Sequence, residues 1–168
     1  MSKKRLSQTK KNIVFLGHMG SGKSTIGRGL SKKLGLDFYD TDKEIEKEIG
    51  QKIAKIFDES GESIFRNIER KITLKLLDKK NSIIALGGGG FEDLKIRKLI
   101  LNKCNSIWLK CDLNILEKRC RVSKKRPLLS NKNIKAEFER LNKIRQKNYS
   151  RAKFTIDVSK KNRHQIIR

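Results

Sequence analysis

Proline, cysteine and aromatic residues are scarce in this 168-residue sequence, which has one proline, three cysteines and 6% aromatic residues. Cys104, Cys111 and Cys120 are odd in number and too widely spaced for a zinc site, so we expect structural thiols rather than a disulfide scaffold. No run approaches the roughly 18 apolar residues of a membrane span. The basic N-terminal tail, residues 1–11, lacks the apolar segment of a secretory signal. We therefore expect one cytoplasmic domain over residues 1–168 and no membrane partner.

Acidic residues are also few: 18 carboxylates stand against 42 lysines and arginines, giving a formal net charge of +24. Such an excess can indicate a nucleic-acid-binding protein. Most of the basic residues are lysines spread along every segment, however, and no aromatic residues interleave with them as stacking platforms. We therefore expect no specific nucleic-acid partner, and a positive field that attracts anionic ligands in general.

A glycine-rich segment, GHMGSGKS at residues 17–24, matches a complete phosphate-binding loop. A β-branched and aromatic run at residues 12–16 precedes it, and apolar side chains follow at helical spacing at Ile26, Leu30 and Leu34. Strand, loop and helix thus occur in the order that binding of a nucleoside triphosphate requires. The expected ATP contacts in this segment are Gly20, Ser21, Gly22, Lys23, Ser24 and Thr25.

Short apolar runs alternate with helical segments along the whole chain. The expected strands are residues 12–16, 36–40, 82–86, 106–110 and 154–158. The longest helix is expected at about residues 62–79, after a break at 58–61, with an apolar stripe at Ile64, Ile68, Ile72 and Leu76. A further helix is expected from Glu92. Strands that alternate with helices predict a single α/β domain with a parallel sheet covered on both faces.

Two carboxylates, Asp40 and Asp42, follow the second expected strand. Ligands of open α/β sheets bind beyond the carboxyl ends of the strands, so these acids and the glycines at 87–90 are expected on the ligand-binding edge. Alternate positions of an extended segment would point both acids to one side. The structural alternative is that Asp42 caps a helix starting at Lys43. Asp112, which follows the fourth expected strand, is another candidate acid.

Several motifs occur in a fixed order: GxxGxGKST from residue 17, FYDxD from 38, FR at 65, GGG at 87, RPLL at 126 and RxxxY at 145. With them the sequence resembles the shikimate kinase family from residue 12 to about 162. The resemblance implies a P-loop kinase fold with a five-stranded parallel sheet of order 2-3-1-4-5 and a mobile lid at about residues 122–131. It also implies transfer of a phosphoryl group from ATP to the 3-hydroxyl of shikimate, on the route to chorismate and aromatic amino acids.

The resemblance assigns the substrate side of the site. Arg66 and Arg145 would hold the substrate carboxylate, because a guanidinium pairs with a carboxylate through two parallel hydrogen bonds. Asp42 would bind substrate hydroxyls and accept the proton of the 3-hydroxyl, as a catalytic residue. The remaining substrate contacts are implied at Gly87, Gly88 and Gly89, with Gly88 as the direct contact.

The resemblance also assigns the nucleotide side. Lys23 and the lid residue Arg126 would be catalytic, since both would stabilise charge on the transferring phosphoryl group. Arg119 would stack on the adenine, and Lys160 would make a second adenine contact. ATP and shikimate are the expected partners of a monomer.

Mg²⁺ is the implied cofactor, held by Ser24 and, through a water molecule, by Asp40. Two other functions stay open at this point. Another P-loop small-molecule kinase, for gluconate or a nucleoside monophosphate, would keep the loop and lid but has no reason to keep Asp42, Arg66 and Arg145 together. A basic, nucleotide-gated RNA-binding module would tolerate the loss of Asp42.

Overall fold

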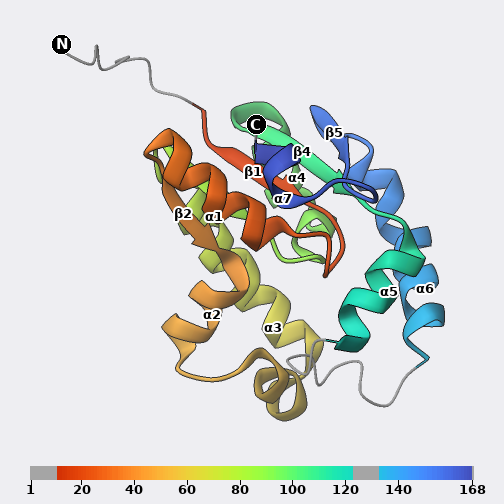
Figure 1. Cartoon of the computed structure of the whole chain (residues 1–168). Helices are drawn as coiled ribbons and strands as arrows, with labels where there is room; N and C mark the ends of the chain where they lie inside the picture. The colour runs from red at the N-terminus through yellow and green to blue at the C-terminus, as the bar shows by residue number, and fades with distance from the viewer. Residues whose placement is uncertain (1–10, 123–132, 168) are drawn as a thin grey trace.

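A central parallel sheet with helices on both faces organises the molecule (Figure 1). The computed structural model describes residues 11–122 and 133–167. Its strands are β1 (Ile13–Leu16), β2 (Asp37–Asp40), β3 (Ser82–Ala85), β4 (Asn105–Lys110) and β5 (Phe154–Asp157). They form a five-stranded sheet in the order β2-β3-β1-β4-β5, with every pair parallel. The expected α/β fold and strand order are therefore confirmed.

The helices that connect these strands are α1 (Lys23–Leu34), α2 (Thr41–Ile49), α3 (Ile53–Leu77), α4 (Leu94–Lys103), α5 (Leu113–Val122), α6 (Ile134–Tyr149) and α7 (Arg163–Ile167). The helix expected from Glu92 starts differently, because a single 3-10 turn, η1 (Gly90–Glu92), comes first. Asp93 then caps α4 by accepting hydrogen bonds from the N–H groups of Lys95 and Ile96. None of the helices described within residues 11–122 and 133–167 is long and apolar enough to cross a membrane.

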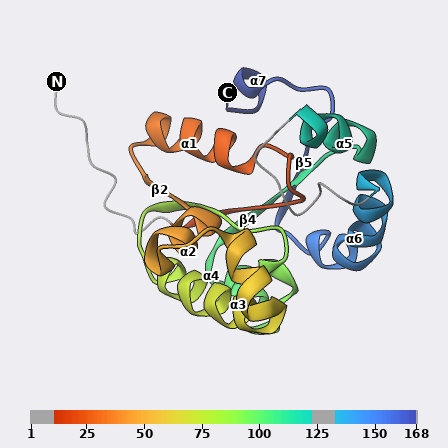
Figure 2. The same cartoon turned by 90° about the horizontal axis from the view of Figure 1, so that it is seen from below.

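The strands bury side chains on both faces of the sheet, because successive residues of a strand point to opposite sides. Val14 and Leu16 belong to a large apolar cluster with residues of α2, α3 and α4. Phe15 points the other way, into a second cluster with Ile26 of α1 and residues of α7. Figure 2 shows the two layers, with α1 and α7 on one side of the sheet and α2, α3 and α4 on the other.

Helix α3 is broken at Gly61, whose φ of 78° and ψ of 171° are not helical. The expected break at 58–61 is therefore confirmed at Gly61, although residues 58–60 are helical. The expected apolar stripe is wrong at Ile64, which is 48% exposed. Phe65 is buried instead and packs on Phe57, with ring centroids 4.5 Å apart. The helix restarts after Gly61 with residue 65 rather than 64 facing the sheet. Leu34, at the last position of α1, is likewise 43% exposed and lies outside the core.

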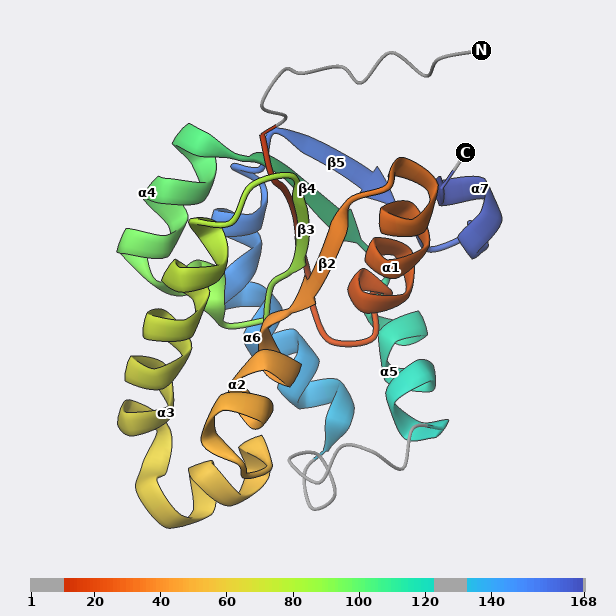
Figure 3. The same ribbon diagram turned by 90° about the vertical axis from the view of Figure 1, so that its left-hand side faces the viewer.

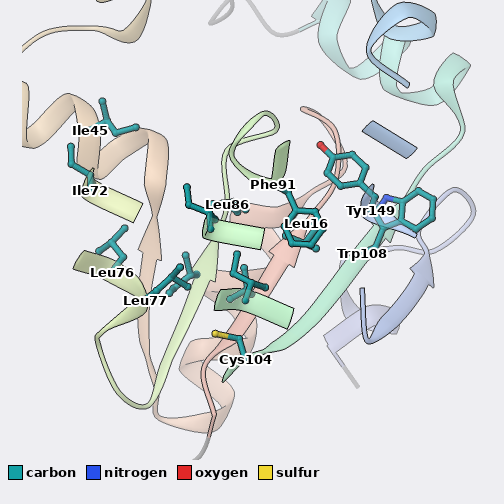
Figure 4. Packing of buried hydrophobic residues seen from close by; sticks show 14 of the residues in the cluster. Leu16, Ile45, Ile72, Leu76, Leu77, Leu86, Phe91, Cys104, Trp108 and Tyr149 are labelled. Carbon is teal, nitrogen blue, oxygen red and sulfur yellow. The ribbon is translucent and has the colours of Figure 1, made fainter. Parts of the chain in front are cut away.

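An aromatic group closes one end of the large cluster (Figure 4). The ring centroid of Tyr149 lies 6.4 Å from that of Phe91 and 6.0 Å from that of Trp108. All three side chains are buried. The contacts seat the end of α6 and the turn η1 on the sheet, and these two elements form one wall of the site described next.

Candidate active site

The segment between β1 and α1 forms the phosphate-binding loop. Gly20 and Gly22 have φ values of 81° and 96°, in the left-handed region that favours glycine. Lys23 Nζ donates to the carbonyl oxygens of Gly17 and His18, at 2.7 and 2.9 Å, so its ammonium group folds back over the loop. The first turn of α1 contains no acidic residue. The backbone N–H groups at this helix start, together with Lys23, therefore provide a positive site for phosphate.

Asp40, at the end of β2, reaches two elements of the site. Its Oδ2 accepts a hydrogen bond of 2.5 Å from the Ser24 hydroxyl, next to the phosphate-binding loop. Its Oδ1 accepts from the N–H of Lys43 and so caps α2. The alternative in which Asp42 caps this helix is therefore wrong: the cap is Asp40. The Ser24 and Asp40 oxygens thus lie together beside the phosphate-binding loop.

Asp42 lies in the first turn of α2, because β2 runs directly into that helix at Thr41 (Figure 3). The expected alternation of Asp40 and Asp42 along an extended segment is therefore wrong. Asp42 is packed so closely on the next loop that a Cβ on Gly87 would lie 2.6 Å from its Oδ1.

The pKa of Asp42 is raised to about 6 by the protein that surrounds it and by the Asp40 carboxylate, while Lys23 acts in the opposite direction. Asp42 is nevertheless exposed to solvent. A carboxyl group with a pKa near neutrality can exchange a proton at working pH, as a general base must.

Arg66, on α3, is held by two carboxylates. Its Nη1 donates to Glu69 at 2.7 Å, and its Nε and Nη2 donate to Glu62 at 3.3 and 3.1 Å. Both carboxylates raise the pKa of Arg66, against the effect of its partial burial. The guanidinium lies flat against the glycine loop, since a Cβ on Gly89 would be 2.5–2.8 Å from its carbon and two terminal nitrogens. Only glycine leaves room for it there.

Glu69, the partner of Arg66, is a site residue that the sequence motifs do not include, and it is only 3% exposed. A signal was present: Glu69 lies on the same face of α3 as the buried Phe65 and Ile72, and three residues after Arg66. A carboxylate on an apolar helix face requires a partner, since unpaired buried charge is costly.

Arg145, on α6, reaches the same loop from the opposite side and is only 9% exposed. A Cβ on Gly88 would lie 2.9 Å from its Nη1. One turn further along α6, the Tyr149 hydroxyl donates to the Gly88 carbonyl oxygen at 2.5 Å. Burial raises the pKa of Tyr149, so it stays a neutral donor. Across residues 11–122 and 133–167, no carboxylate lies within 4.0 Å of Arg145.

The glycine loop that follows β3 presents two unused donors. The Gly87 N–H donates to the Thr41 hydroxyl at 2.7 Å, and the Gly90 N–H to the Gly87 carbonyl at 3.0 Å. Within the described part of the chain, the N–H groups of Gly88 and Gly89 have no acceptor. A cleft of about 640 Å³ opens beside them, with Arg66, Glu69, Gly89 and Arg145 among its lining residues. Four arginines line the cleft, and two of them, Arg66 and Arg145, lie against the glycine loop beside its unoccupied backbone donors, an arrangement that suits a carboxylate.

Two of the expected adenine contacts lie at the surface. Arg119 Nη1 donates to the Gly20 carbonyl oxygen at 3.1 Å and so stands beside the phosphate-binding loop. Lys160 is exposed and follows Ser159, whose hydroxyl accepts from the N–H of Asp112. Arg119 therefore lies next to the phosphate-binding loop. Lys160 lies in the segment after β5, and no hydrogen bond or ion pair joins it to that loop in the described part of the chain.

Two further sequence expectations have different outcomes. Asp112 Oδ1 accepts a hydrogen bond from the N–H of Asn114 at the start of α5. This carboxylate therefore caps α5 and is not directed to the phosphate-binding loop. Arg126 and nearly all of the expected lid fall within residues 123–132, outside the described residues.

Residues 19–168 match the family model for shikimate kinase. The chain is 42% identical over 160 residues to a shikimate kinase of Bartonella quintana, an alignment covering 95% of this chain and 76% of the relative. It is also 42% identical to a shikimate kinase of Persephonella marina, with 94% of each chain covered. The solved shikimate kinase of Acinetobacter baumannii in complex with shikimate superposes with a TM-score of 0.90 at 32% identity, covering 95% of this chain and 89% of that one. The chain belongs to the shikimate kinase family.

Proposed function

We propose that this enzyme transfers the γ-phosphoryl group of ATP to the 3-hydroxyl of shikimate, giving shikimate 3-phosphate and ADP, on the route to chorismate. One observation carries the assignment of the site: Arg66 and Arg145 approach neighbouring glycines from opposite walls of one cleft. Adjacent Cα atoms are about 3.8 Å apart, so the two guanidinium groups lie close enough to share one carboxylate.

The substrate carboxylate would lie between the two arginines and accept from the free N–H groups of the glycine loop. Arg145 has the stronger need for such a partner, because it is nearly buried and no described carboxylate pairs with it. Arg66 is already held by Glu62 and Glu69, which orient it. A carboxylate held by a guanidinium fork is fixed in direction as well as in place. The ring hydroxyls would then face Asp42, which packs against Gly87 at the start of the same loop.

Asp42 would take the proton of the 3-hydroxyl as its oxygen attacks the γ-phosphorus and the bond to the bridging oxygen of ADP breaks. Its pKa, raised to about 6, makes the carboxylate a stronger base while leaving most of it ionised at neutral pH. Lys23, which lies close enough to lower that pKa, would stabilise the charge of the β- and γ-phosphates. Gly20, Ser21, Gly22 and Thr25 would complete the phosphate site through their backbone.

Ser24 and Asp40 would hold Mg²⁺, Asp40 through a water molecule. Their oxygens fit this ion, which takes few protein ligands and keeps several waters. When bound, Mg²⁺ neutralises the β- and γ-phosphate oxygens during transfer. Arg119 and Lys160 would contact the adenine, and Arg126 would close over the phosphates. We expect the enzyme to act as a monomer without a nucleic-acid partner.

A panel of phosphoryl acceptors tests this proposal. Release of ADP would be measured with shikimate, gluconate and several nucleoside monophosphates at equal concentration. We expect turnover with shikimate alone. The nucleoside monophosphates lack a carboxylate, and gluconate, although it has a carboxylate and hydroxyls, is an open chain that does not hold its hydroxyls in a fixed direction from the carboxylate as a ring does. Comparable turnover with gluconate or a nucleotide would contradict the assignment, and ATP-dependent RNA binding without turnover would favour the binding module.

The pH dependence of turnover should report on Asp42. The base must be ionised, so turnover should rise as the pH increases through about 6 and level off above it. Asp42→Asn should lose this inflection together with most of the turnover, while shikimate affinity changes less. A pH profile of kcat for both proteins checks the expectation. An unchanged inflection in the variant would mean that another group is the base.

The same substitution should slightly stabilise the fold. The pKa of Asp42 is higher in the folded chain than its ordinary value of 3.8, so folded Asp42 binds its proton more tightly. Its ionisation therefore lowers stability as the pH rises from about 4 through 6, and the loss persists at neutral pH. Solvent reaches the side chain, so we expect a gain below about 1 kcal/mol in Asp42→Asn at pH 7 and none at pH 3. Thermal melts at both pH values measure it.

A further inference from the structure

Arg97, on α4, forms a contact that neither the sequence motifs nor the proposed chemistry uses. Its Nη1 donates to two backbone carbonyl oxygens, those of Phe91 at 2.8 Å and Glu92 at 3.0 Å. These carbonyls stand at the end of η1, where a helical turn leaves its last oxygens without partners in the turn itself. Arg97 supplies both missing donors from a half-buried position.

No ion pair explains the charge of Arg97. None of the salt bridges within residues 11–122 and 133–167 includes this residue, and its Nε is buried with no hydrogen-bond partner in that part of the chain. A buried polar atom without a partner is unusual in a folded protein and calls for an explanation. Arg97 also does not line the 640 Å³ cleft, so it cannot touch a substrate there. Any effect of Arg97 on substrate binding must therefore act through the backbone of η1, to which it is hydrogen-bonded.

The turn η1 is joined directly to the glycine loop. The Glu92 N–H donates to the Gly89 carbonyl oxygen at 3.0 Å, and the Asp93 N–H donates to that of Gly90. On the other side, the Glu92 carboxylate accepts from the Asn148 side chain at 2.8 Å, which ties the turn to α6 next to Tyr149. A displacement of η1 would therefore move Gly89 relative to Arg66 and Gly88 relative to Arg145.

We infer that Arg97 is a positioning residue for substrate binding: it holds η1 so that the free N–H groups of Gly88 and Gly89 face the carboxylate between the arginines. The inference rests on the proposed function of that cleft. A guanidinium suits the task because one of its terminal nitrogens carries two N–H bonds, each aimed at one carbonyl in a fixed plane. A lysine ammonium can reach the same oxygens but is not held in one plane.

Two substitutions of Arg97 test the inference. Arg97→Met keeps the length of the side chain but removes both donors, and Arg97→Lys restores a donor. We expect Arg97→Met to raise KM for shikimate roughly tenfold, because small displacements in a binding site have large effects, while KM for ATP stays within about twofold. Arg97→Lys should have a KM for shikimate between those of Arg97→Met and the unmodified enzyme. Lys98→Met, at the next, exposed position of α4, is the matched control and should match the unmodified enzyme.

A parallel rise of both KM values, or no rise in either, would overturn the inference, because a general structural defect affects both substrates. If Arg97→Met does not fold, Arg97→Lys alone decides: we expect KM for shikimate to rise a few-fold with KM for ATP unchanged. Failure of the proposed function looks different, since the unmodified enzyme would then not phosphorylate shikimate.

Discussion

Lys23→Ala is expected to lose phosphoryl transfer by roughly 10²–10³-fold in kcat, the usual effect of removing one preorganised charge from a transition state. The Lys23 ammonium bonds to the Gly17 and His18 carbonyls, at the mouth of the phosphate-binding loop rather than in the apolar core. Removing it takes positive charge from the place where negative charge accumulates during transfer. Release of ADP with saturating shikimate measures the loss.

Lys32→Ala is the matched control for this variant. Lys32 lies in the last turn of the same helix and is exposed, so its loss changes the net charge equally without touching the loop. We expect its kcat to equal that of the unmodified enzyme. Thermal melts should show both variants folded. Turnover of Lys23→Ala equal to that of the unmodified enzyme would contradict the proposal that this loop binds the phosphates of ATP.

Arg145→Ala should weaken shikimate binding by about 2–5 kcal/mol, the range found when one partner of a buried charge pair is removed. The large value follows from the burial of Arg145 and from the lack of a carboxylate partner for it among the described residues. ATP affinity measured alone should hardly change. Isothermal titration of each ligand separates the two effects, and Lys143→Ala, an exposed change on the same helix, is the control.

Arg66→Ala should act in the same direction with a smaller effect. The Arg66 side chain is 35% exposed, and its loss leaves the buried Glu69 carboxylate without its cation. Arg66→Ala should therefore also lower the free energy of unfolding, because it leaves a buried carboxylate unpaired. A shikimate analogue without the carboxylate should bind the unmodified enzyme poorly. Arg66→Ala and Arg145→Ala should then weaken the binding of this analogue little further. Equal weakening of ATP and shikimate, or good binding of the analogue, would contradict the carboxylate clamp.

Much of the fold was predictable because its signals are local. The run at 12–16, the glycine loop and the helix after it are contiguous, and the structure contains them at Ile13–Leu16 and Lys23–Leu34. Helix phase was less predictable. Ile64 and Leu34 follow an apolar spacing but are exposed. The face of α3 that is buried after the break at Gly61, and the number of turns of α1 that the core covers, both depend on tertiary packing. Likewise Asp40 rather than Asp42 caps α2, since β2 enters the helix without an intervening residue.

The sequence by itself determined the phosphate-binding loop and the five alternating strands, because both depend on residue types at short spacings. Its resemblance to the family also predicted which residues would bind a carboxylated substrate. Only the tertiary structure decided that Arg66 and Arg145 meet at Gly88 and Gly89, that Glu69 pairs with Arg66, and that Arg97 donates to the carbonyl oxygens of η1. These contacts join elements far apart in the chain, or depend on burial, and both arise only when the helices pack on the sheet.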